Sequence, residues 1–134
     1  MRGAWMRVKC IAAAPSPALA EALGHMYVAG KTEYPVEVGA EYIVLGVGFW
    51  EGVAWFEIAP SMRTLVSVPA ALFAIISGRP SRHWDVRMHP DGAVTLWPHS
   101  FYNAHYHDHL SEGVPEALED FTHLLSLLER EAAP

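Results

Sequence analysis

The sequence lacks the means to cross-link itself or to cross a membrane. Of its 134 residues only Cys10 is a cysteine, so an internal disulfide and zinc sites built on paired cysteines are excluded. No apolar run approaches the roughly 20 residues of a membrane span. The run from Cys10 to Ala14 is also shorter than the apolar core of a secretory signal, about 7–15 residues. We expect a cytoplasmic protein that does not bind membranes, with its natural start at Met1 or Met6.

Charged residues are scarce, and acidic residues outnumber basic ones. They make up 18% of the chain against 51% hydrophobic residues, and the formal net charge is -6. This composition is typical of a folded globule, and the length predicts a single domain over residues 1–134. The acidic balance argues against nucleic acid as a partner and suits a partner with a basic surface.

Motifs that carry catalysis are also missing. The sequence contains no G-x-G-x-x-G, no P-loop and no G-x-S-x-G, so nucleotide binding and serine-hydrolase chemistry have no motif support. We therefore expect no catalytic residue and no cofactor, although the sequence does not decide whether the protein is an enzyme.

What the sequence does contain is two β-hairpin patterns. The run over 41–58 alternates around Glu51-Gly52, and the run over 83–97 turns at Pro90-Asp91-Gly92. We expect the first arm to be one strand with four apolar residues on one face: Ile43, Leu45, Val47 and Phe49. Gly46 and Gly48 inside this arm indicate a bulge or strong coiling of the kind that a small barrel requires.

Helical patterns lie near both ends of the chain. Ser16 can cap a short helix that begins at Pro17 and ends at Gly24. The C-terminal segment has a helical stripe that we expect to be buried, and Leu124 widens this stripe: Leu118, Phe121, Leu125 and Leu128. Further strands are predicted over 7–12 and 63–69, and a helical turn followed by a strand over 70–77. The predicted fold is α+β: a small coiled antiparallel sheet or SH3-like open barrel, with a short N-terminal helix and a C-terminal helix.

Three histidines at every second position form the most unusual motif, "FYNAHYHDHLSEG". If the segment is extended, His105, His107 and His109 share one face and could bind zinc or copper with Glu112. If it is helical, only His105 and His109 share a face. A histidine-rich polar edge without a ligand is the simpler interpretation. A metal-binding protein or metal-dependent enzyme that uses these residues stays open as an alternative function.

The order of several short segments resembles a loose family of small uncharacterised bacterial proteins. The segments are "MRVKCI", "YPVEVGAEYIVLGVGFWEGVAWFEI", "VPAALFAIISGRPSRHWDVRM", "GAVTLWP" and the acidic C-terminal helix. Its landmarks are Val38-Gly39-x-x-Tyr42-x-Val44 and Pro69-x-x-Leu72-Phe73, and the histidine cluster is not among them. Some members look like immunity proteins of polymorphic toxin systems, which neutralise a cognate toxin by binding it. The resemblance implies a non-catalytic protein-binding module.

An acidic patch is the predicted binding surface of such a module. Its members lie where the histidine segment meets the C-terminal helix: Asp108, Glu112, Glu116, Glu119 and Asp120. Carboxylates of this kind attract lysines and arginines and speed encounter with a basic partner, so we expect a basic toxin domain. A self-associating structural module, and hence a homo-oligomer, is the other alternative.

Overall fold

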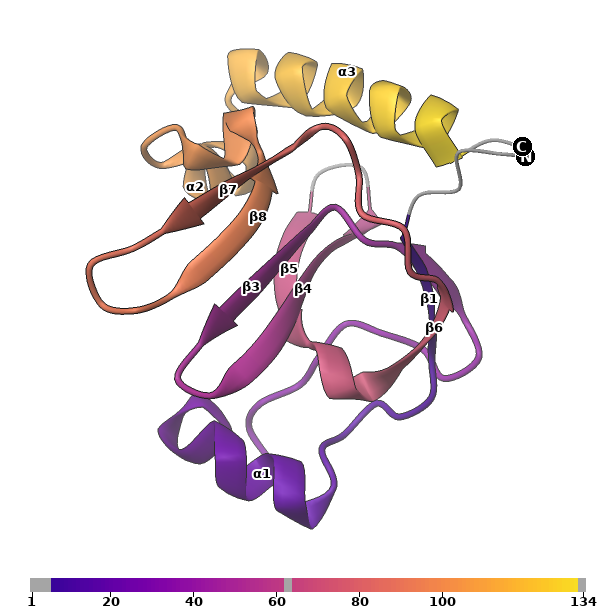
Figure 1. The fold of residues 1–134 in the computed structure, drawn as a ribbon, viewed down its shortest axis with the longest axis vertical. Helices are drawn as coiled ribbons and strands as arrows, with labels where there is room; N and C mark the ends of the chain where they lie inside the picture. The colour runs from indigo at the N-terminus through magenta and orange to yellow at the C-terminus, as the bar shows by residue number, and fades with distance from the viewer. Residues whose placement is uncertain (1–5, 62–63, 133–134) are drawn as a thin grey trace.

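The computed structural model describes residues 6–61 and 64–132. Met1 and residue 63, where one predicted strand begins, lie outside the described residues. Two antiparallel sheets and three α-helices make up this part of the chain, as Figure 1 shows. The predicted α+β class is confirmed, and the sheets do not close into a barrel.

The smaller sheet has the strand order β2-β1-β6 and the larger sheet the order β5-β4-β3-β8-β7. The small sheet comprises β1 (Arg7–Cys10), β2 (Glu41–Ile43) and β6 (Phe73–Ser77). The large sheet comprises β3 (Gly46–Trp50), β4 (Val53–Ser61), β5 (Thr64–Pro69), β7 (Trp84–Met88) and β8 (Val94–Pro98). Both predicted hairpins are present, as β3–β4 and β7–β8.

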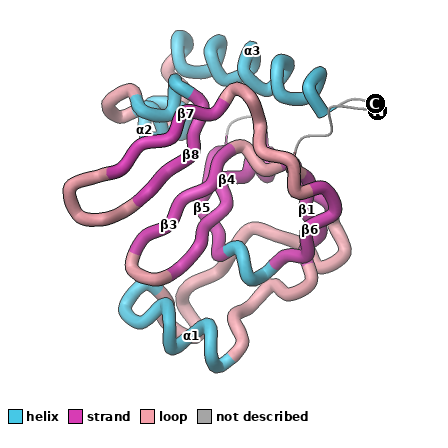
Figure 2. The backbone as a smooth tube through the Cα atoms, in the orientation of Figure 1, coloured by secondary structure: helices cyan, strands magenta, loops and turns pink. Residues whose placement is uncertain are grey.

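The helices lie outside the sheets, as Figure 2 shows. The α-helices are α1 (Pro17–Leu23), α2 (Tyr106–Ser111) and α3 (Pro115–Ala132). The short 3-10 turns are η1 (Gly24–Met26), η2 (Ala70–Leu72) and η3 (His99–Tyr102). α1 has the predicted ends, since the Ser16 hydroxyl accepts the Leu19 N–H at 3.2 Å and Gly24 follows the last residue. No helix in the described part of the chain combines the length and apolar character that a membrane crossing needs.

The arm predicted as one strand over 42–49 is divided between the two sheets. Ile43 of β2 pairs with Arg7 in the small sheet, whereas Gly46 of β3 pairs with Glu57 in the large one. Between them, Val44 and Leu45 are both almost fully buried, at 0% and 1% exposure. Val44 packs in the core between the sheets and Leu45 in the core under α3. Two consecutive buried residues are incompatible with a strand that has one buried face, so the chain changes sheets here.

α3 covers the end of the large sheet with a stripe that differs slightly from the predicted one. Phe121 and Leu128 are 0% exposed and Leu124 is buried beside them. Leu118 and Leu125, which we expected to be buried, lie at the edges of the stripe and are only half-buried. Leu124 thus belongs to the buried centre of the stripe, while Leu118 and Leu125 pack against the same core from its edges.

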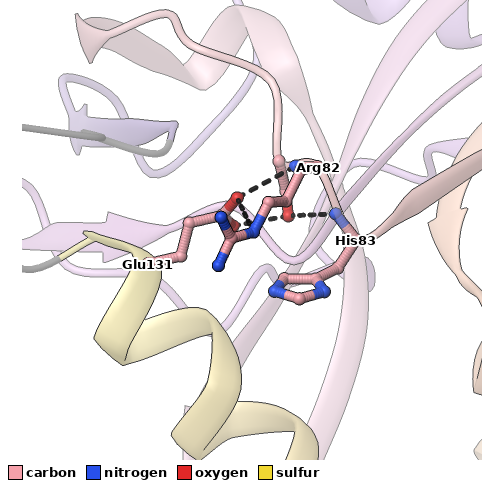
Figure 3. A network of polar contacts seen from close by, with 4 residues as sticks. Arg82, His83 and Glu131 are labelled. Atoms are coloured by element: carbon pink, nitrogen blue, oxygen red, sulfur yellow. Dashed lines mark hydrogen bonds and ion pairs between the residues drawn. The ribbon is translucent and has the colours of Figure 1, made fainter.

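The last turn of α3 is fixed to the loop before β7 (Figure 3). Glu131 accepts a hydrogen bond from the Ser81 hydroxyl at 2.6 Å and another from the Arg82 backbone N–H at 2.9 Å. The Ser81 oxygen in turn accepts the His83 N–H at 3.0 Å. One carboxylate thus satisfies two donors of the loop and holds it against the helix end.

Candidate functional site

One face of the large sheet carries polar and aromatic side chains where a core would carry aliphatic ones. Glu57 of β4 is paired with Ser67 of β5 on one side and with Gly46 of β3 on the other. Gly48 of β3 is paired with Thr95 of β8. Opposite residues of neighbouring strands point to the same face. The side chains of Glu57, Ser67 and Thr95 therefore lie on one face, above the middle of the sheet and around the two glycines.

The two glycines of β3 make room for two tryptophans on this face. A Cβ atom at Gly46 would lie 2.7 Å from Cδ1 of Trp97, and one at Gly48 would overlap the ring of Trp50. β3 pairs with both neighbours without a register shift, so of the two predicted alternatives, a bulge or strong coiling, the bulge is not present. Glycine is needed here because the indole rings lie directly on the strand.

Around the tryptophans lies a cleft of about 520 Å³. Trp50, Trp97 and Ala93 line it together with the side chains described below. Glu51 and Asp91 line it from the turns of the two hairpins, which lie next to each other because β3 pairs with β8. Its size is that of a small-molecule or side-chain binding site.

Glu57 is the buried polar centre of the cleft. Its side chain is 1% exposed, its Oε2 accepts the Ser67 hydroxyl, and its Oε1 lies 3.2 Å from Nε2 of His107. Both carboxylate oxygens therefore have a partner, as a buried carboxylate requires. The carboxylate lies between the hydroxyl and the imidazole, which is not the order of a serine hydrolase triad, where the imidazole contacts the hydroxyl.

A second polar chain supports the β8 side of the cleft. His89 Nε2 lies 2.9 Å from Thr95 Oγ1, which lies 2.7 Å from the Tyr102 hydroxyl. The Arg87 guanidinium carbon lies 3.9 Å from the centre of the Tyr102 ring, which is cation–π geometry. Trp97 packs against Tyr102 at 5.1 Å between ring centres, and its buried indole N–H has no acceptor among the described residues.

The histidine segment is helical, so the three histidines do not meet. His105 precedes α2 with a left-handed backbone, φ 63°. His107 points to Glu57, while the rings of His105 and His109 lie 6.0 Å apart on the exposed side. Within residues 6–61 and 64–132, no three histidine, cysteine or carboxylate side chains are grouped so that they could hold a metal ion. The extended arrangement with three histidines on one face is therefore wrong.

The five predicted binding residues lie on α2, at its C-terminal end and on the first half of α3, and two of them share a groove. Glu116 and Asp120 of α3 line a groove of about 330 Å³ with Tyr106 and His109. The other three, Asp108, Glu112 and Glu119, are exposed and lie outside this groove.

Asp120 is engaged within the protein. Its Oδ2 accepts a hydrogen bond from the hydroxyl of Tyr106 at 2.8 Å. Burial of the ring raises the pKa of Tyr106 above its usual range, and the hydrogen bond and charge of Asp120 raise this pKa further. The pair joins α2 to α3, so these two helices present their exposed carboxylates from one fixed unit.

Acidic and basic residues are distributed unevenly along the chain, a feature that the sequence motifs did not reveal. Between Arg87 and Arg130 the sequence has no lysine or arginine. This stretch holds seven carboxylates: Asp91, Asp108, Glu112, Glu116, Glu119, Asp120 and Glu129. The rest of the chain has eight acidic and nine basic residues, so the whole acidic excess comes from residues 88–129. A scan for the spacing of basic residues would have found this.

Comparison with family models, curated proteins and solved structures found no match to the chain. The resemblance to immunity proteins therefore gains no support beyond the sequence motifs.

Proposed function

We propose that this protein binds a basic protein partner through α2 and the first half of α3, and that it neutralises a toxin in this way. The acidic surface, as we call it below, comprises the five residues Asp108, Glu112, Glu116, Glu119 and Asp120. The observation that carries the proposal is that the entire acidic excess lies in residues 88–129. A carboxylate-rich region without basic side chains attracts a positively charged partner over several ångströms and repels acidic ones.

The acidic surface is also held in place before a partner arrives. Tyr106 of α2 bonds to Asp120 of α3, and His107 of α2 contacts Glu57 of the sheet. Figure 1 shows the start of α3 lying next to α2 above the β7–β8 hairpin. Binding to a preformed surface costs little conformational entropy, which suits an inhibitor that has to capture its target quickly and hold it.

The experiment compares two baits with the same change in charge. In the surface variant, Glu112→Lys, Glu116→Lys and Glu119→Lys reverse three exposed members of the acidic surface. In the control variant, Glu21→Lys, Glu33→Lys and Glu37→Lys reverse three exposed carboxylates of the N-terminal part. Both variants have the same net charge, so only the position of the charge differs.

Each bait is immobilised and exposed to lysate of the source cell, and captured proteins are quantified. We expect one basic protein to be captured equally by wild type and control variant, and at least tenfold less by the surface variant. When this protein is then expressed in a susceptible cell, wild type and control variant should restore growth and the surface variant should not. Equal capture by both variants would contradict the proposed surface, and capture without growth protection would contradict the neutralising role.

A further inference from the structure

We propose that the cleft above Glu57 receives the side chain of an arginine that the partner supplies. This inference rests on the proposed function and specifies what the protein recognises beyond overall charge. The cleft adjoins the acidic surface, since His107 lines the cleft and the next residue, Asp108, belongs to the surface. A partner that binds α2 therefore lies beside the mouth of the cleft.

The charge of the cleft selects a cation. Of the residues that the structure describes, three carboxylates line it and no lysine or arginine does. Glu57 uses both oxygens internally, but Glu51 and Asp91 are exposed. Asp91 Oδ1 accepts the Ala93 N–H at 3.0 Å. Among the described residues, no hydrogen-bond partner is present for the second Asp91 oxygen or for the Glu51 carboxylate. These oxygens can accept donors from a bound cation.

The aromatic lining selects a flat cation. Trp50 and Trp97 both line the cleft, and tryptophan is the ring that binds cations most strongly. Trp50 is fixed by stacking on Trp55, with ring centres 5.1 Å apart and planes 6° apart. A guanidinium group is planar, stacks on such rings and offers five N–H donors to carboxylates, whereas an ammonium group is a compact charge. One guanidinium already stacks on an aromatic ring nearby, since Arg87 lies over Tyr102, whose hydroxyl contacts Thr95 of the cleft lining.

The first test uses two small probes that match in shape but differ in charge. The probe is N-acetyl-arginine amide, and its neutral control is N-acetyl-citrulline amide, which has the same shape without the charge. Binding is followed by indole N–H shifts of Trp50 and Trp97 in NMR spectra. We expect saturable shifts with the arginine probe and at least tenfold weaker binding of the citrulline probe. Equal binding of the two probes, or no shift with arginine at saturating concentration, would overturn the proposal.

The second test changes the cleft. Glu51→Gln with Asp91→Asn should weaken arginine binding at least fivefold, while Glu33→Gln with Glu37→Gln, which alters carboxylates that do not line the cleft, should leave it unchanged. A loss of equal size in both variants would contradict a specific cleft. Thermal melts of each variant show whether it is folded.

The third test separates this inference from the proposed function. Ala93→Arg places an arginine inside the cleft without touching the acidic surface, and it should reduce capture of the basic partner at least tenfold. A contradicting result is capture of the partner by the Ala93→Arg variant and by the Glu51→Gln, Asp91→Asn variant but not by the surface variant. This result would overturn the cleft as the arginine receptor and leave the proposed function standing. If the arginine probe binds in the cleft but wild type captures no partner, the proposed function is overturned. The inference that a partner supplies the arginine is then overturned as well.

Discussion

Glu57 Oε1 and His107 Nε2 lie 3.2 Å apart although 50 positions separate them in the sequence. The contact joins the centre of the large sheet to α2, and thereby fixes the helix that carries part of the acidic surface. Because Glu57 is 1% exposed while His107 is 35% exposed, the pair lies at the boundary between the core and the cleft. Its loss should affect both stability and binding.

His107→Ala removes the partner of Glu57 Oε1 and should lower the free energy of unfolding by about 1–3 kcal/mol, the usual cost of leaving a buried acceptor unsatisfied. His109→Ala is the matched control, because it removes an exposed histidine from the same helix and should change stability by less than about 0.5 kcal/mol. Urea midpoints of the three proteins give the comparison. Equal effects at both positions would mean that the Glu57–His107 contact does not stabilise the fold.

Gly48→Ala introduces a Cβ atom where the ring of Trp50 lies. We expect a loss of about 1–3 kcal/mol from overpacking, and a smaller loss in a Trp50→Ala background, where the obstacle is absent. Gly78→Ala should be nearly neutral, since its nearest neighbour would be a side-chain atom at 3.5 Å. Additive effects of Gly48→Ala and Trp50→Ala in denaturant titrations would show that the ring is not what requires glycine.

Phe121→Ala empties the centre of the α3 stripe, where the side chain is 0% exposed. Stability should fall by about 3–5 kcal/mol, the cost of truncating a buried phenylalanine. Leu125→Ala should cost less, because Leu125 is half-buried at the edge of the stripe. The order of the two denaturation midpoints is the decisive result, and a larger loss at Leu125 would contradict its position at the edge of the stripe.

Local patterns predicted most of the fold because each depends on neighbouring residues alone. The cap of α1 at Ser16, the Glu51-Gly52 turn and the helical stripe on α3 are of this kind. The change of sheet at Val44 and Leu45 was not predictable, since the apolar alternation continues through it and only the distant partners of each half reveal the break. The bounds of the first strand were also two residues too long, since β1 ends at Cys10.

The candidate site was predicted less well, because its parts meet only through tertiary packing. The histidine motif drew attention to the right segment, but His107 acts with Glu57 and not with its neighbours His105 and His109. Glu57 itself gave one unused signal, a carboxylate inside the apolar run "VAWFEIA". Such a residue has to find donors once the strand is buried, and those donors came from Ser67 and α2.

Raising the pH should destabilise the protein through Tyr106. The folded-state pKa of Tyr106 lies above the ordinary tyrosine value of 10.0, first because of burial and then because of Asp120. As the pH rises, the Tyr106 hydroxyl therefore loses its proton in the unfolded protein before it does so in the folded protein. The stability that Tyr106 contributes is complete below pH 10 and is lost as the pH rises above it. The free energy of unfolding of Tyr106→Phe should fall less steeply than that of wild type between pH 9 and 11.

Tyr34→Phe is the companion variant for the alkaline measurement, because burial also raises the pKa of Tyr34. The Tyr34 hydroxyl has no hydrogen-bond partner among the described residues, so this variant should also flatten the alkaline fall but cost nothing at pH 7. Parallel curves for wild type and Tyr106→Phe would show that the Tyr106 proton is not linked to folding.

Binding of a basic partner through the acidic surface is tested most directly by its association rate constant. Stopped flow gives this rate constant for the captured basic protein with wild type and with the surface variant, at low and at high salt. We expect wild-type association to slow at least tenfold on going from low to high salt, because salt screens attraction between surfaces. The surface variant should associate slowly at both salt concentrations, and the control variant should behave as wild type. Equal rate constants for wild type and surface variant at low salt would contradict binding through the acidic surface.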